Sequence, residues 1–219
     1  MSTLLFGSIG TLADTSELQR QAFNDAFKTH DLPWQWDREE YQTLLASSGG
    51  ADRISEYAKS TGTDGVDATA VHQTKSERFR ELLAEAPPAL RDGVADTIKA
   101  GRTGGHKLAL VTTTSPENVD AILTALAPAV SRDDFDLIVD TTQVDQPKPD
   151  PAAYRFALEQ LNSDAADAVA IEDNVGGVQA ARAADLRCFG FPGSNNAAHD
   201  FSAATKTVER LDLDELTAA

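Results

Sequence analysis

The sequence predicts an α/β fold in which a doubly wound parallel sheet forms the core and an all-helical segment follows the first strand. In the second half of the chain, short apolar runs of strand length alternate with stretches of helical periodicity. One further strand-like run stands alone at the start, and residues 14–89 after it show helical patterns without a convincing strand. The length of 219 residues allows one sizeable domain or a core with a small inserted domain.

The first strand is expected within residues 3–12, where TLLFGSIGTL runs into a glycine-containing turn. A helix follows with Ser16 as its N-cap, since its apolar residues recur on one face. Pro87 and Pro88 end the helical segment because proline cannot continue a helix. The other helices of this segment are expected near 37–47, near 50–60 and within 66–86.

The second half alternates regularly between strand and helix, which predicts a parallel, Rossmann-like sheet covered by helices on both faces. We therefore assign residues 1–13 and 90–219 to the core domain and residues 14–89 to a helical cap domain. A surface helix is expected near the C-terminus. The expected strands are 106–113, 135–141, 167–173 and 186–191, and the expected helices are 92–101, 116–127, 151–161 and 175–184.

Charge and composition narrow the class of partner. A formal charge of −16 argues against nucleic acid or an anionic membrane surface as a partner, and the charge leaves the identity of any protein partner unknown. No apolar run approaches the roughly 20 residues needed to span a bilayer, and the start lacks the features of a secretory signal. The single cysteine, Cys188, lies in the apolar stretch LRCFGF and is expected to be a buried thiol. A cytoplasmic location is expected.

Polar side chains follow successive predicted strands, where ligands bind in open α/β sheets. Thr112–Ser115 supply hydroxyls, Lys148 stands between prolines, and Glu172 and Asp173 form an acidic pair. Hydroxyls and helix amides suit phosphate, a lysine offsets its charge, and a carboxylate pair suits Mg²⁺. Each feature also has a structural interpretation, namely helix capping, a solvated loop charge and an acidic pair at a helix start. Their order after successive strands favours a phosphate site.

These motifs resemble those of the haloacid dehalogenase-like (HAD-like) hydrolase superfamily. The similar group has a helical cap and includes β-phosphoglucomutase and phosphoglycolate-phosphatase-like enzymes. The resemblance covers essentially the whole chain and implies a sugar-phosphate phosphatase-like hydrolase. TTTSPENV at 112–119, KPDPAAY at 148–154 and AIEDNVGGVQAARAADL at 170–186 are similar to the second, third and fourth motifs of that family.

The resemblance implies a role for each motif. Thr112 would bind the transferring phosphoryl group with Thr113 beside it, and Lys148 would steady that group and the nucleophile. Glu172 and Asp173 would hold Mg²⁺, directly or through water. A small phosphorylated metabolite is the implied ligand.

In the cap, the run Ser48-Gly49-Gly50-Ala51-Asp52-Arg53 resembles a substrate-reading loop, with Arg53 placed for a distal anionic group. This loop and TTTSPENV together indicate the xylulose- or ribulose-bisphosphate-phosphatase-like branch.

The first motif departs from the family pattern D-x-D-G-T, because LLF-GSI-GTL aligns with it without a gap. Gly7 replaces the nucleophilic aspartate, and Ile9 replaces the aspartate that acts as general acid and base. Glycine offers no nucleophile, and isoleucine cannot move a proton. With glycine at position 7 in place of the family's aspartate, the implied Mg²⁺ site also lacks a direct carboxylate ligand and is weakened. Gln19, a candidate substrate-binding residue, stands where relatives often have histidine, and Asp14 is expected to cap a helix or assist cap closure.

Three hypotheses follow. The first is a HAD-like hydrolase by descent that has lost catalysis, a pseudoenzyme that still binds phosphate or a sugar phosphate. The second is an active Mg²⁺-dependent phosphatase that uses metal-activated water. The third is a non-enzymatic binding or regulatory protein with Trp34, Trp36 and Tyr41 as anchors, although packing inside the cap is the simpler expectation for these aromatic residues. Loss of both acids favours the first hypothesis.

Overall fold

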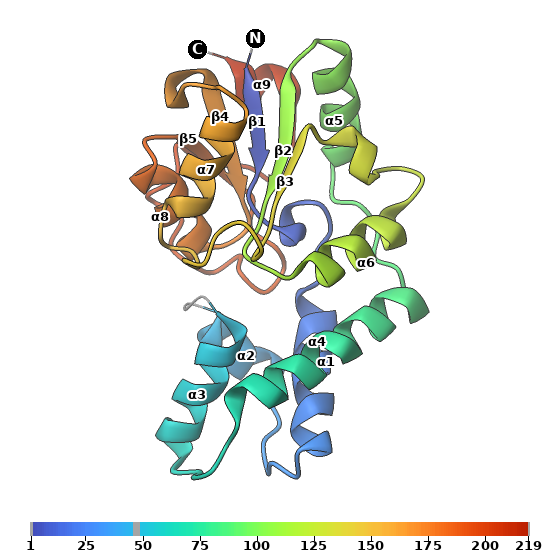
Figure 1. Cartoon of the computed structure of the whole chain (residues 1–219), viewed down its shortest axis with the longest axis vertical. Helices are drawn as coiled ribbons and strands as arrows, with labels where there is room; N and C mark the ends of the chain where they lie inside the picture. Colours follow the sequence, from blue (N-terminus) through green and yellow to red (C-terminus); the bar gives the residue numbers. More distant parts are fainter. Residues whose placement is uncertain (1, 46–48, 219) are drawn as a thin grey trace.

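The computed structural model describes residues 2–45 and 49–218, and within them six parallel strands form one sheet with helices on both faces (Figure 1). The strand order is β3-β2-β1-β4-β5-β6, which confirms the predicted doubly wound parallel sheet. The strands are β1 (Thr3–Phe6), β2 (Lys107–Val111), β3 (Leu137–Val139), β4 (Ala168–Glu172), β5 (Arg187–Gly190) and β6 (Lys206–Thr207).

Strand β1 lies at the centre of the sheet, between β2 and β4. Phe6, its last residue, is in register with Leu110 of β2 and Ile171 of β4. The first, second and fourth motifs therefore begin at the same edge of the sheet, although more than 100 residues separate the first from the second. Strand β6 was not predicted, because two exposed residues, Lys206 and Thr207, carry no apolar pattern.

Neighbouring residues of each strand face opposite layers. Leu4 and Phe6 pack with α5 (Val94–Thr103), α6 (Pro116–Leu126) and α9 (Leu213–Thr217) on one face. Leu5 packs on the other face with α7 (Ala152–Gln160) and α8 (Val175–Ala183). The helix expected near the C-terminus is α9, and its Leu216 is buried against the core. Cys188 is buried as predicted, and burial raises the pKa of its thiol.

Four helices lie beyond the carboxyl ends of the strands, toward which the arrowheads point in Figure 1. They are α1 (Ser16–Thr29), α2 (Arg38–Leu44), α3 (Gly50–Thr61) and α4 (Ala68–Glu85), and they correspond to the predicted helical insert. The exact domain limits at residues 13 and 90 stay a prediction. Within the described part of the chain, no helix is both long and apolar enough to cross a membrane.

The cap helices have an apolar core of their own, built around aromatic rings. Trp36 and Tyr41 are 0% and 2% exposed, and Trp34 is 7% exposed. The ring centroids of Phe27 and Trp36 lie 4.6 Å apart in an edge-to-face arrangement. The hypothesis that these residues anchor a partner is therefore wrong, because a four-helix unit needs them to fill its own interior.

Candidate functional site

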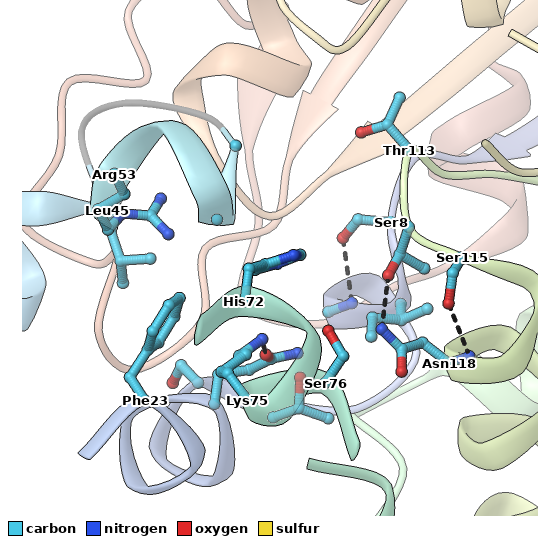
Figure 2. A pocket seen from close by; sticks show the side chains of 18 of the residues that line it. Ser8, Phe23, Leu45, Arg53, His72, Lys75, Ser76, Thr113, Ser115 and Asn118 are labelled. Carbon is cyan, nitrogen blue, oxygen red and sulfur yellow. Dashed lines mark hydrogen bonds between the residues drawn. The ribbon is translucent and has the colours of Figure 1, made fainter. Parts of the chain in front are cut away.

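A cleft of about 710 Å³ separates the carboxyl edge of the sheet from the cap helices (Figure 2). Ser8, Thr113 and Ser115 line its core side, while Arg53 and Lys75 line its cap side. A smaller cavity of about 210 Å³ adjoins it and is lined by residues of all four motifs. We call this smaller cavity the inner recess, with Gly7, Thr112, Lys148 and Asp173 among its lining residues.

The first motif turns sharply after β1. The backbone N–H of Gly7 still donates to the carbonyl of Ile171 at 2.8 Å, which keeps the glycine in line with the sheet. The hydroxyl of Ser8 accepts from the N–H of Gly10 and donates to Oδ1 of Asp173 at 2.6 Å. Ser8 thereby joins the first motif to the fourth. Ile9 is 7% exposed and belongs to the core cluster, so an apolar side chain stands at the predicted acid–base position.

The space beside Gly7 is occupied by other residues. An ideal Cβ built on Gly7 would overlap the carboxylate of Glu172 and the hydroxyl of Tyr154, and a Cβ on Gly177 would also overlap Glu172. Glu172 is fully buried, and its Oε1 accepts from Lys148 at 2.6 Å and from Tyr154 at 2.7 Å. Its Oε2 has no hydrogen-bond partner among the described residues. Glu172 therefore sits between two glycines and fills the volume that a residue-7 side chain would need.

Lys148 is buried with 5% exposure, so its interpretation as a solvated loop charge is wrong. Its ammonium group donates to the carbonyl oxygens of Gly7 and Val111 and to Glu172. Because an ammonium has three N–H groups, all of its donors are in use. A phosphoryl oxygen could reach Lys148 only by displacing one of these acceptors. The implied role of Lys148 in steadying phosphate stays a prediction.

The predicted metal ligands do not point to one place. Glu172 is enclosed, and burial raises its pKa, although Lys148 opposes that shift. Asp173 faces the cleft, where its Oδ1 accepts from Ser8 and from Nδ2 of Asn174 at 2.9 Å. The described residues contain no group of three His, Cys, Asp or Glu side chains placed to hold a metal ion. Since Mg²⁺ prefers several oxygen ligands in octahedral geometry, a single open carboxylate does not fit a resident Mg²⁺ site.

The hydroxyls of the second motif have different roles. Ser115 caps α6 by accepting from the N–H of Asn118, so the capping interpretation is correct for this residue. Thr112 is 3% exposed, and its hydroxyl accepts from the N–H of Thr114 at 3.2 Å. Thr113 lines both the cleft and the inner recess and lies across from the cap helices in Figure 2.

The predicted substrate-reading loop lies at the start of α3, with Ser48 outside the described residues. Arg53 follows three residues after the helix begins at Gly50. Its guanidinium donates through Nε to the carbonyl of Leu44 at 2.8 Å, and burial lowers its pKa. Arg53 is 7% exposed and lines both cavities, so the structure places it where the cleft and the inner recess meet.

Two cleft residues on α4, His72 and Lys75, were not predicted. The ammonium of Lys75 donates to Oε1 of Gln19 and lies 4.8 Å from the ring centroid of Phe23. Burial, followed by the charge of Arg53, lowers the pKa of Lys75 to about 7. Burial also lowers the pKa of His72 to about 4, with Lys75 and Arg53 adding to the shift. Arg53 and Lys75 are therefore the cations on the cap side of the cleft, and His72 beside them is a neutral imidazole near neutral pH.

A hinge-side network joins the cap to the core. Asp14 accepts from the N–H of Ser16 at 3.1 Å and from the N–H of Ser194 at 2.6 Å. Asn195 donates to Glu17 at 2.7 Å and accepts from Nε of Arg38 at 2.9 Å. The carboxylate of Asp14 thus accepts hydrogen bonds at the start of α1 and from the core at Ser194, and its expected role in cap closure stays a prediction.

Comparison with known proteins gives concordant matches. The family described as haloacid dehalogenase-like hydrolase matches residues 1–185. Protein CbbY of Cereibacter sphaeroides is 39% identical over 211 residues, which cover 95% of this chain and 92% of the relative. A crystal structure of CbbY from Rhodobacter sphaeroides with phosphate has a TM-score of 0.88 at 39% identity, covering 96% of this chain and 94% of the other. A mutant of that protein, solved with xylulose-(1,5)bisphosphate, has a TM-score of 0.89 with the same coverage.

Proposed function

The chain belongs to the haloacid dehalogenase-like hydrolase family, and from that premise we propose that it binds a phosphorylated sugar without efficiently hydrolysing it. Support for the ligand comes from the relative that is 39% identical and was solved with xylulose-(1,5)bisphosphate. The cleft of this chain lies between core and cap and is lined by hydroxyls on one side and by Arg53 and Lys75 on the other. Hydroxyl and cationic groups are the partners that phosphate oxygens favour.

The observation that carries the proposed loss of hydrolysis is the filled space beside Gly7. A covalent mechanism needs a nucleophile, and the nearest carboxylate, Glu172, is fully buried and held by Lys148 and Tyr154. An enclosed carboxylate cannot approach a phosphorus atom in the cleft. Ile9 adds a second loss, because general acid–base catalysis contributes roughly 10²–10⁴-fold to many reactions.

The donor set disfavours hydrolysis by metal-activated water. Such a reaction needs an ion held firmly enough to acidify a bound water molecule. Asp173 supplies one carboxylate to the cleft, while Glu172 is turned inward toward Lys148. If Mg²⁺ enters with the ligand, Asp173 and the ligand's own phosphate oxygens are the groups that would hold it.

Turnover and binding measured side by side test this proposal. We expect xylulose 1,5-bisphosphate to bind by calorimetry, while a panel of phosphate esters with added Mg²⁺ gives a kcat/KM well below roughly 10⁴ M⁻¹s⁻¹. A kcat/KM at or above that value would refute the proposed loss of hydrolysis. Absence of binding for every phosphorylated sugar tested would refute the proposed ligand class.

A further inference from the structure

Lys75 is a buried cation that lines the cleft and lacks a compensating charge. Its exposure is 6%, and the ion pairs of the described residues do not include it. The hydrogen-bond acceptor on its ammonium group is the neutral amide oxygen of Gln19. The charged neighbour that influences it, Arg53, has the same sign.

Burying the ammonium charge of Lys75 without a counter-ion costs free energy, and the aromatic rings around it reduce that cost only in part. Its Nζ lies 4.8 Å from the ring centroid of Phe23 and 5.2 Å from that of Phe79. Cation–π contacts offset only a small part of the free-energy cost of burying an ion. An anion bound beside Lys75 in the cleft would supply the negative charge that compensates its ammonium group.

His72 lies one turn before Lys75 on α4 and also lines the cleft. In Figure 2, His72, Lys75 and Arg53 stand on the side of the pocket opposite Thr113 and Ser115. Lys148, in contrast, donates all three of its protons inside the protein. On the cap side, the ammonium of Lys75 has Gln19 as its hydrogen-bond acceptor among the described residues, so its other N–H groups can donate to an anion in the cleft.

We infer that Lys75, assisted by His72 and Arg53, forms an oxyanion site that takes a phosphoryl group of the ligand without a divalent cation. This inference rests on the proposed function and specifies which wall of the cleft holds the phosphate. Thr112 and Lys148 in the inner recess then contribute little to affinity.

The pKa values in the cleft give the site a pH dependence. Lys75, with a pKa of about 7, is charged in acid and loses its charge as the pH rises, unless a bound anion raises that pKa. Asp52 favours the charged form of His72. The other ionisable groups among the described residues that line the cleft are Asp14, Tyr41, Glu77, Arg80, Glu117 and Asp173.

Calorimetric titration of inorganic phosphate and of xylulose 1,5-bisphosphate into the intact chain in EDTA tests the inference. We expect Lys75→Gln to weaken binding at least tenfold, and Lys59→Gln, the same change at an exposed lysine of α3, to leave affinity within about twofold. Adding Mg²⁺ should change the parent's affinity by less than about twofold. Binding that survives Lys75→Gln, falls equally in Lys59→Gln or requires Mg²⁺ would overturn the inference.

Sulfate serves as a second probe, because its charge does not change over the pH range of the experiment. Its affinity for the parent should fall at least several-fold between about pH 6 and about pH 8.5, and this dependence should disappear in Lys75→Gln. A parent that binds neither phosphate ligand would refute the proposed function as well. A parent that binds both, with Lys75→Gln unaffected, would refute only the site at Lys75.

Discussion

The inner recess and the cap side of the cleft each contain a buried lysine, and the two lysines have opposite surroundings. Lys148 and Lys75 are 5% and 6% exposed, so burial does not distinguish them. Lys148 meets the carboxylate of Glu172 and two carbonyl oxygens, whereas Lys75 meets a neutral amide and two aromatic rings. The comparison teaches that a buried charge indicates a ligand site only where the protein leaves that charge uncompensated.

The same comparison supports the proposed function, in which the chain binds a phosphorylated sugar without efficiently hydrolysing it. Where Gly7 lacks a side chain, Glu172 and Tyr154 fill the space, and the carboxylate of Glu172 neutralises Lys148. Lys148 and Glu172 therefore form a buried ion pair at the inner recess. On the cap side, the cations still face the cleft.

Removing Lys148 should produce the largest change in stability. Lys148→Met leaves the carboxylate of Glu172 buried without a cation, a loss that typically costs about 3–5 kcal/mol. Denaturant unfolding at neutral pH measures it. Lys206→Met is the matched control, because Lys206 pairs with Glu215 at the surface and such pairs contribute about 0–1 kcal/mol. Equal losses in the two variants would contradict the comparison.

Restoring the two acids should not restore phosphatase activity. It should also lower the free energy of unfolding, by less than Lys148→Met does. Gly7→Asp with Ile9→Asp places a side chain where Glu172 and Tyr154 already lie, so we expect a loss of about 1–3 kcal/mol from overpacking and no gain in phosphatase turnover. Gly7→Ala with Tyr154→Phe should recover part of the loss seen in Gly7→Ala alone. A double-aspartate variant with normal stability and measurable turnover would show that Glu172 moves aside easily.

The fold could be predicted from the sequence because its signals are local and repeated. Apolar runs such as 106–113 and 167–173 alternate with helices, and this pattern suffices for a parallel sheet and for the order of the motifs. The two residues of β6 have no such pattern. The motifs also placed Thr112, Lys148 and Asp173 around one recess, as the structure shows.

The direction of Glu172 could not be predicted, because it depends on space left by Gly7 and Gly177, which are 170 residues apart in the chain. Lys75 did have a sequence signal. Val71, Lys75 and Phe79 recur every four residues on one helix, so a lysine interrupts the buried stripe. Which pocket that lysine lines depends on the packing of α4 against α1 and α3.

The change in unfolding free energy in Lys75→Met at about pH 6, with and without inorganic phosphate, tests the central claim most directly. The pKa of Lys75 is lowered to about 7 in the folded chain. Above that pH the unfolded chain binds more protons at this site than the folded chain, so the parent gains stability as the pH rises; below it the free-energy cost of burying the charge is fully present. The account predicts that Lys75→Met is more stable than the parent by about 1 kcal/mol or more at that pH, a gain that shrinks as the pH rises, and that phosphate no longer stabilises it. A variant that is less stable than the parent and still stabilised by phosphate would contradict it.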